Sequence, residues 1–253
     1  MNKKKEKIVV VGAGVIGLST AVCIQENISD ADVTLVADKF NEETLSYGAG
    51  GLFRPEVNIG ISPDIIKRWS ENSYKHFIQI AMSNEAENAG VQIVSGYQMN
   101  SYDKERLKNE IVSQIVPEVR EMTQREHEMF PNRFKYGIFW TTFIADPRYY
   151  LSWLTKKFTS KGGKMLFKHV NHLKELADYD IIVNCTGLNA KYLVDDWKMT
   201  PVRGQAIKVK APWIKHFYYG DGAYIIPGRD YVTLGGVKEY GDWNTNLDQF
   251  DRK

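Results

Sequence analysis

Residues 7–24 are Lys7-Ile-Val-Val-Val-Gly12-Ala-Gly14-Val-Ile-Gly17-Leu-Ser-Thr-Ala-Val-Cys-Ile24, and they indicate the fold more directly than any later segment. An apolar, β-branched run leads into a glycine-rich turn, and apolar residues at helical spacing follow, which predicts a buried parallel strand, a turn and a helix. Gly12 suits a tight turn, Gly14 lets backbone approach a ligand, and Gly17 lets the helix lie close to the strand. The pattern G-x-G-x-x-G in this context favours a site that holds a dinucleotide pyrophosphate at the helix N-terminus.

A second strand is predicted at residues 32–37, and it ends at Asp38. Asp38 follows Gly17 at about the 20-residue spacing expected for the acid that binds a ribose hydroxyl. The alternative is a βαβ unit that binds no nucleotide, and this spacing makes it the less favoured interpretation.

The composition places the chain among globular proteins and excludes several classes of partner. The 253 residues are 43% hydrophobic, enough for two modest lobes or one large α/β domain. With 33 basic and 31 acidic side chains the net charge is +2, so we expect no nucleic-acid partner and no membrane association. Cys23 and Cys185 are interpreted as reduced core residues. His169 and His172 are expected in a surface loop, and no metal site is predicted.

The remaining pattern predicts alternating strands and helices, and then an antiparallel sheet. Strands are expected at residues 90–97, 136–143, 164–170, 179–187, 206–209, 223–226 and 231–234, and helices at 63–83, 104–129 and 147–158. A second glycine-dense stretch, Tyr47–Pro55, indicates close approach of backbone to a ligand, and a flexible loop is its alternative. The predicted fold class is mixed α/β, with a Rossmann-like nucleotide-binding domain interleaved with an antiparallel-sheet domain.

Several motifs together carry a family resemblance. In chain order they are GAGVIGLSTAVCI, ADKF, AGGLFRP, VQIVSGYQ, IIVNCTGL, PVRGQ, APWIKHF, YIIPG and VTLGG. From Lys7 to about Asn244 the chain resembles the FAD-dependent family of D-amino-acid oxidases and D-aspartate oxidases, and it is more similar to the D-aspartate branch.

The resemblance implies a set of residues that bind FAD. Those under the pyrophosphate would be Gly12, Ala13, Gly14, Val15, Ile16 and Gly17. Asp38, with Lys39 beside it, would bind the adenosine ribose, and the Val170 backbone would meet the adenine. The diphosphate and flavin would be lined by Ser46, Ala49, Gly50, Gly51 and Leu52.

The resemblance also implies oxidative deamination of a D-amino acid with oxygen as electron acceptor. Tyr224 matches the tyrosine that binds the substrate carboxylate, although a core aromatic is the alternative for a strand tyrosine. Lys238 and Arg54 are candidate cations for a side-chain carboxylate. With a short predicted loop over residues 217–223, they favour D-aspartate or D-glutamate as substrate. For Lys238 the alternative is a solvated surface charge.

Three other functions stay open: oxidation of neutral D-amino acids, a non-catalytic shortened homologue, and a nicotinamide dehydrogenase, which the glycine motif alone would allow.

The expected division is an FAD-binding domain at 1–55 and 145–200, and a substrate-binding and interface domain at 56–144 and 201–253. The resemblance implies a further C-terminal segment, with a carboxylate-binding arginine and a flavin-contacting loop, that has no counterpart before Lys253. A homodimer is an expectation of the same kind. The family's usual address is a peroxisomal C-terminal tripeptide, and Asp251-Arg252-Lys253 is not one, so both a peroxisomal and a cytoplasmic location stay open.

Overall fold

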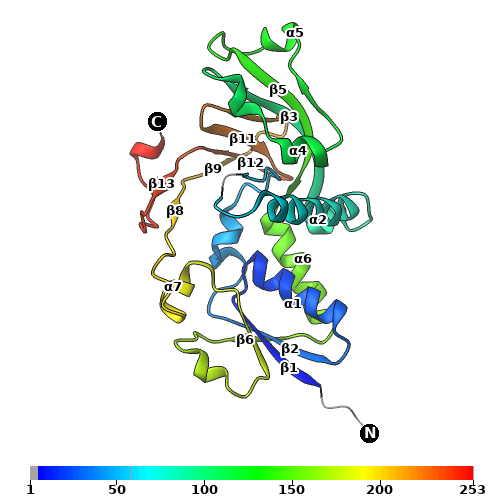
Figure 1. Cartoon of the computed structure of the whole chain (residues 1–253), viewed down its shortest axis with the longest axis vertical. Helices are drawn as coiled ribbons and strands as arrows, with labels where there is room; N and C mark the ends of the chain where they lie inside the picture. Colours follow the sequence, from blue (N-terminus) through cyan, green and yellow to red (C-terminus); the bar gives the residue numbers. More distant parts are fainter. Residues whose placement is uncertain (1–4, 58, 253) are drawn as a thin grey trace. The chain divides into compact units, whose positions relative to one another are not determined.

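The computed structural model describes residues 5–57 and 59–252, and the chain divides into two compact units (Figure 1). The first unit comprises Met1–Ala49, Pro147–Val202 and Tyr240–Trp243, and the second comprises Gly50–Asp146, Arg203–Glu239 and Asn244–Lys253. Each unit is therefore assembled from segments that are distant in the sequence. Which ligand each unit holds stays a prediction.

The first unit is built on a four-stranded parallel sheet in the order β6-β2-β1-β7. Its strands are β1 (Glu6–Val11), β2 (Ala31–Ala37), β6 (Lys164–Phe167) and β7 (Ile181–Asn184). The central strands β1 and β2 carry the buried β-branched residues, as expected for a sheet covered on both faces. Helices α1 (Val15–Asn27) and α6 (Pro147–Ser160) pack against each other in this unit.

Short elements complete the first unit. They are η1 (Asn41–Glu43), η2 (Leu45–Gly48), η4 (Leu173–Leu176), η5 (Gly187–Asn189) and α7 (Ala190–Leu193). Cys23 was expected in the core, but the structure exposes it. The reason is that α1 turns Leu18, Ala21 and Val22 inward, and Cys23 lies on its outer face. Cys185 is half-buried, and burial raises the pKa of its thiol.

The second unit is built on a seven-stranded sheet in the order β4-β5-β3-β10-β11-β12-β9. Its strands are β3 (Val91–Asn100), β4 (Val119–Glu121), β5 (Tyr136–Ala145), β9 (Ile207–Val209), β10 (Phe217–Gly220), β11 (Ala223–Pro227) and β12 (Val232–Gly235). Only β3 and β10 pair in parallel among these neighbours. Trp140 and Phe217 meet edge to face in the core, and helix α2 (Pro63–Ala81) packs on β3 and β5. The mixed α/β fold class is confirmed.

The single helix expected at 104–129 is wrong. The structure has four short elements there: η3 (Lys104–Leu107), α4 (Glu110–Ile115), β4 and α5 (Gln124–His127). Pro117 accounts for the break, because a proline lacks an N–H and disfavours helical backbone in the residue before it. Val116 is accordingly extended, with φ −84° and ψ 153°.

The connection expected over residues 217–223 is short, as predicted, but its predicted bounds are wrong. Phe217–Gly220 is strand β10 in the middle of the sheet, and only Asp221 and Gly222 connect it to β11. Both connecting residues have positive φ, 48° and 91°, as a tight two-residue hairpin turn requires. An Asp-Gly pair after aromatic residues is itself a hairpin signal.

The last elements are short. They are α3 (Ala86–Ala89), the paired strands β8 (Val202–Arg203) and β13 (Glu239–Tyr240), and η6 (Phe250–Arg252). Over the described residues, no helix has both the length and the apolar character needed to cross a bilayer.

Candidate active site

The glycine turn between β1 and α1 is closely packed by backbone. Gly12 has φ +109°, and a Cβ there would lie 2.4 Å from the Cys185 carbonyl oxygen. A Cβ on Gly17 would lie 1.8 Å from the Gly12 carbonyl oxygen. Side chains at either position would therefore push α1 or the segment after β7 away from β1.

The N-terminus of α1 presents backbone amides suited to an anion. The first helical hydrogen bond runs from the Leu18 N–H to the Gly14 carbonyl at 3.0 Å, so the amides of Ile16 and Gly17 precede any intrahelical acceptor. The Val15 N–H donates to Ser46 Oγ at 3.0 Å, which joins two predicted cofactor residues. The first turn of α1 contains no acidic residue, so the positive end of the helix dipole is not neutralised there.

Asp38 stands directly after β2, and the structure gives it a partner. His169 Nδ1 lies 2.5 Å from Asp38 Oδ2, in the surface loop after β6 where His169 was expected. Lys39, the next residue, is exposed. Val170 packs at the edge of the cluster formed around Val9, Val11 and Val36. Sequence reasoning missed His169, since its pairing with Asp38 depends on the parallel register of β2 and β6.

The second glycine-dense stretch is ordered against the edge of β5. The Ala145 N–H donates to the Gly51 carbonyl at 2.9 Å, and Leu52 forms a β-bridge with Ile144. Gly51 has φ +74°, and a Cβ on Gly50 would lie 2.9 Å from Ile226 Cδ1. Ala49, just before them, belongs to the first unit. These contacts favour close packing over the flexible-loop alternative for this stretch.

Tyr224 belongs to a row of residues that crosses four strands of the second unit. In strand register, Gln98 on β3 pairs with Tyr219 on β10, Tyr219 pairs with Tyr224 on β11, and Tyr224 pairs with Gly235 on β12. The Tyr219 and Tyr224 rings stack at 5.8 Å between centroids, with planes 16° apart. A Cβ on Gly235 would lie 2.3 Å from Tyr224 Oη, so Gly235 leaves the space that the tyrosine occupies.

Arg54 lies over this row. Its guanidinium carbon is 4.5 Å from the centroid of the Tyr219 ring, and its Nε donates to Gln98 Oε1 at 3.4 Å. Its Nη1 donates to Glu56 Oε1 at 2.7 Å. Tyr219 therefore connects Arg54 to Tyr224, which are two of the three substrate residues expected from the sequence.

Tyr224 has the protonation state needed to donate a hydrogen bond. Burial, and secondarily the nearby Tyr219, raises the pKa of the Tyr224 hydroxyl above its ordinary value. The phenol is therefore neutral around pH 7, and it can donate to a carboxylate. Together with the Arg54 cation, it offers two distinct partners for acidic groups.

Lys238 lies outside this row. It is exposed in the segment between β12 and β13, where its neighbour Glu239 is paired with Arg203. No shared contact joins it to Arg54 or Tyr224 within the part of the chain that the structure describes. The sequence reasoning missed Tyr219, Gln98 and Gly235, because their places beside Arg54 and Tyr224 follow from strand register.

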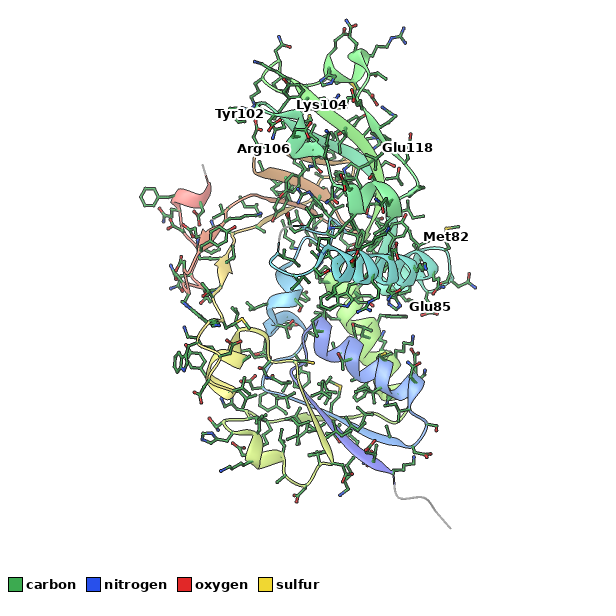
Figure 2. The ribbon with its side chains drawn as sticks, in the orientation of Figure 1. Met82, Glu85, Tyr102, Lys104, Arg106 and Glu118 are labelled. Atoms are coloured by element: carbon green, nitrogen blue, oxygen red, sulfur yellow. The ribbon has the colours of Figure 1, made fainter. Side chains whose placement is uncertain are left out.

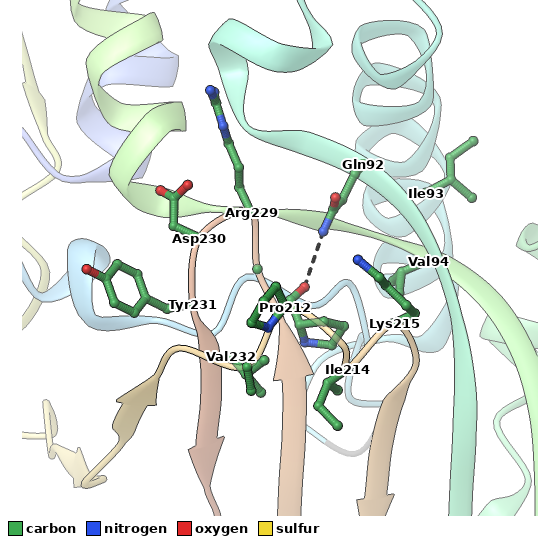
Figure 3. Close-up of a pocket in the computed structure, with 13 residues that line it drawn as sticks. Gln92, Ile93, Val94, Pro212, Ile214, Lys215, Arg229, Asp230, Tyr231 and Val232 are labelled. Carbon is green, nitrogen blue, oxygen red and sulfur yellow. Dashed lines mark hydrogen bonds between the residues drawn. The ribbon is translucent and has the colours of Figure 1, made fainter.

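Described residues of the second unit border at least two cavities. A cavity of about 780 Å³ is bordered by Arg54, Glu56 and Gln98, and by the segment that carries Lys104 and Arg106, labelled in Figure 2. A smaller cavity of about 300 Å³ lies beside β3 and the turn after β11, where the Gln92 amide donates to the Pro227 carbonyl (Figure 3). Of these two cavities, only the larger is lined by a predicted site residue, Arg54.

Comparison with known families matches this chain, over residues 7–253, to the family described as DAO, FAD dependent oxidoreductase. The chain belongs to this family. Human D-aspartate oxidase is 41% identical over 246 residues, a match that covers 96% of this chain and 71% of the human protein. D-aspartate oxidase 1 of Caenorhabditis elegans is 34% identical over 98% of this chain and 74% of its own. A D-amino acid oxidase of Dugesia ryukyuensis is 32% identical, with 97% and 74% covered.

Solved structures of oxidases share the fold. Glycine oxidase from Geobacillus kaustophilus superimposes with a TM-score of 0.78 at 14% identity, covering 98% of this chain and 76% of that chain. L-α-glycerophosphate oxidase from Mycoplasma pneumoniae, solved with FAD bound, has a TM-score of 0.67 at 14% identity, with 95% and 73% covered. At this level of identity the likeness concerns the fold alone.

FAD is the cofactor of the family, and the glycine turn fits it. Gly12 and Gly17 remove the side chains that would block the turn, and the amides beyond Gly14 are directed for a pyrophosphate. The nicotinamide alternative is set aside by the family match.

Proposed function

We propose that this protein oxidatively deaminates acidic D-amino acids, D-aspartate and D-glutamate, to a 2-oxo acid, ammonia and hydrogen peroxide. FAD, when bound, would accept the hydride from the substrate Cα and return the electrons to oxygen. The likeness to D-aspartate oxidases supports this reaction class. The residues of this chain would bind and orient the substrate so that its Cα–H bond is held in line for transfer.

The observation that carries the acidic preference is the stack of Arg54, Tyr219 and Tyr224. The Tyr224 hydroxyl would donate to the α-carboxylate, and Arg54 would bind the side-chain carboxylate. Arg54 is held for this role because the Tyr219 ring and Gln98 both contact its guanidinium. A guanidinium that is already positioned loses less side-chain entropy when a ligand binds.

Lys238 is the competing candidate for the same carboxylate. Because it is exposed and separate from the Arg54 stack, we propose a smaller contribution from it. A hydrogen bond to a charged group contributes about 1.5–3 kcal/mol. Its loss in the transition state would lower kcat/KM for the acidic substrate by roughly 10- to 100-fold.

The test compares kcat/KM for D-aspartate and D-alanine in the FAD-loaded protein, measured by hydrogen peroxide release. Arg54→Met should lower the D-aspartate to D-alanine ratio by about 10- to 100-fold, whereas Lys238→Met, the matched removal of one exposed charge, should change it much less. The reverse order would assign the role to Lys238.

A wild-type preference for D-alanine would support the neutral-substrate alternative. Anaerobic addition of D-aspartate to the FAD-loaded protein should bleach the flavin absorbance. Absence of bleaching with either amino acid would support the non-catalytic homologue.

A further inference from the structure

We propose that Glu56 is an internal competitor for the substrate carboxylate at Arg54, and so a determinant of how tightly a dicarboxylate binds. This inference rests on the proposed function, because it takes Arg54 as the cation for the side-chain carboxylate. It adds a residue that the chain's motifs do not indicate, two positions after Arg54.

The contacts of Arg54 already place one carboxylate on its guanidinium. The Tyr219 ring covers one face, and Gln98 Oε1 accepts from Nε. Nη1 donates to Glu56 Oε1 at 2.7 Å. A guanidinium binds a carboxylate most strongly in a bidentate pair through two of its nitrogens. A substrate carboxylate that binds Arg54 through both terminal nitrogens must therefore displace Glu56 from Nη1.

The two partners differ in their freedom to move. The Arg54 side chain is 23% exposed, whereas the Glu56 side chain is 60% exposed. Glu56 can therefore rotate into water without losing packing, whereas Arg54 would have to leave the Tyr219 ring. When a substrate carboxylate arrives, the group displaced is Glu56.

Hydrogen bonds hold the backbone around the Arg54–Glu56 ion pair in place, so that only the Glu56 side chain has to move. The Phe53 N–H donates to the Phe143 carbonyl at 3.0 Å, and Thr142 Oγ1 donates to the Phe53 carbonyl at 2.9 Å. The Asn109 amide donates to the Pro55 carbonyl at 2.9 Å. Since these bonds hold the chain on both sides of Arg54, exchange of carboxylates needs only a rotamer change at Glu56.

The exchange is energetically mild, and the surrounding cavity has room for it. An ion pair with an exposed partner is weak, because water and salt screen it and holding it costs side-chain entropy. The cavity of about 780 Å³ that Arg54 and Glu56 border gives the displaced Glu56 side chain room to turn away from Arg54. A monocarboxylate that does not reach Arg54 leaves the pair intact, so Glu56 lowers dicarboxylate affinity selectively.

The test measures Kd for succinate and for butyrate, which have equal carbon chains but two and one carboxylates. Titration of the FAD-loaded protein is followed by the flavin absorbance change and involves no turnover. Glu56→Gln should lower the succinate Kd by about two- to fivefold, the strength typical of an exposed ion pair, and should leave the butyrate Kd unchanged.

The control variant is Glu105→Gln. Glu105 borders the same cavity and pairs with Lys108 at 2.7 Å, and its side chain is 67% exposed, so the change in charge and exposure is matched. It should not change the ratio of the two Kd values. Equal effects of Glu56→Gln and Glu105→Gln, or a weaker succinate affinity in Glu56→Gln, would overturn the inference.

Arg54→Met separates failure of this inference from failure of the proposed function. If Arg54→Met leaves the succinate to butyrate ratio unchanged, the assigned role of Arg54 is wrong and the inference falls with it. If Arg54→Met weakens succinate selectively and Glu56→Gln has no effect, only the role of Glu56 is refuted.

Discussion

Replacement of Gly17 by alanine tests the packing of the glycine turn most directly. The new Cβ would lie 1.8 Å from the Gly12 carbonyl oxygen and 3.4 Å from Cys185 Cβ. Contacts between such atoms are favourable at about 3.5 Å, so α1 would have to move away from β1 by roughly 1.7 Å. Because the closest atom is backbone, no side-chain rotation relieves the clash.

Two effects of Gly17→Ala on the free energy of unfolding oppose each other. Overpacking typically lowers the free energy of unfolding by about 1–3 kcal/mol, and a clash with backbone lies at the upper end of this range. Alanine has a higher helix propensity than glycine, which raises the free energy of unfolding by at most about 1 kcal/mol. A net loss of about 2 kcal/mol corresponds to a decrease in Tm of roughly 4–8 °C for a chain of this size. Displacement of the helix amides should also weaken FAD binding by more than about tenfold.

The assay combines thermal unfolding, followed by circular dichroism, with FAD titration followed by quenching of flavin fluorescence. Cys23→Ala on the same helix is the control, because Cys23 is exposed on the outer face of α1, away from the glycine turn. Equal Tm and equal FAD affinity in Gly17→Ala and Cys23→Ala would contradict this account of the glycine turn.

Three further predictions concern other parts of the molecule. Gly235→Ala should lower D-aspartate turnover on the order of 100-fold, because the added Cβ would lie 2.3 Å from Tyr224 Oη and displace the hydroxyl. Unchanged steady-state kinetics would contradict the proposed role of Tyr224. The hydrogen bond from Arg120 holds the pKa of Glu126 at about 2, so its stabilisation is present above pH 4.5 and lost as pH falls towards 2. Urea unfolding from pH 7 to 2 should therefore show a shallower loss of stability in Glu126→Gln, and parallel curves would disprove the assignment. Asp38→Ala should weaken FAD binding far more than it lowers Tm, and equal FAD affinity by fluorescence titration would exclude the ribose role.

Local sequence was sufficient for elements with strong periodicity. The strand, glycine turn and helix at the start of the chain were predicted correctly, and so were α2, β3 and β5. These elements depend on interactions between near neighbours and on a hydrophobic face that the pattern displays. The glycine positions were informative for the same reason, since a turn requires particular backbone angles wherever it occurs.

Prediction failed where a local pattern was interrupted or misinterpreted. The apolar spacing at residues 104–129 resembled one helix, but Pro117 ends the helical backbone within it. Residues 217–223 were interpreted as a loop, although the aromatic run and the Asp-Gly pair form a strand and a hairpin turn. Both signals, Pro117 and the Asp221-Gly222 pair, are visible in the sequence and would have predicted the observed structure.

The sequence alone predicted the strand, glycine turn and helix at the start of the chain and, through its ordered motifs, the family to which the chain belongs. The folded structure was needed to show that Arg54 lies over Tyr219, that Tyr219 stacks on Tyr224, and that Lys238 is exposed elsewhere. The difference arises because a glycine turn is encoded by backbone conformation within a few residues. The Arg54 cluster instead depends on strand register between segments far apart in the chain, which becomes definite only when the sheet is assembled.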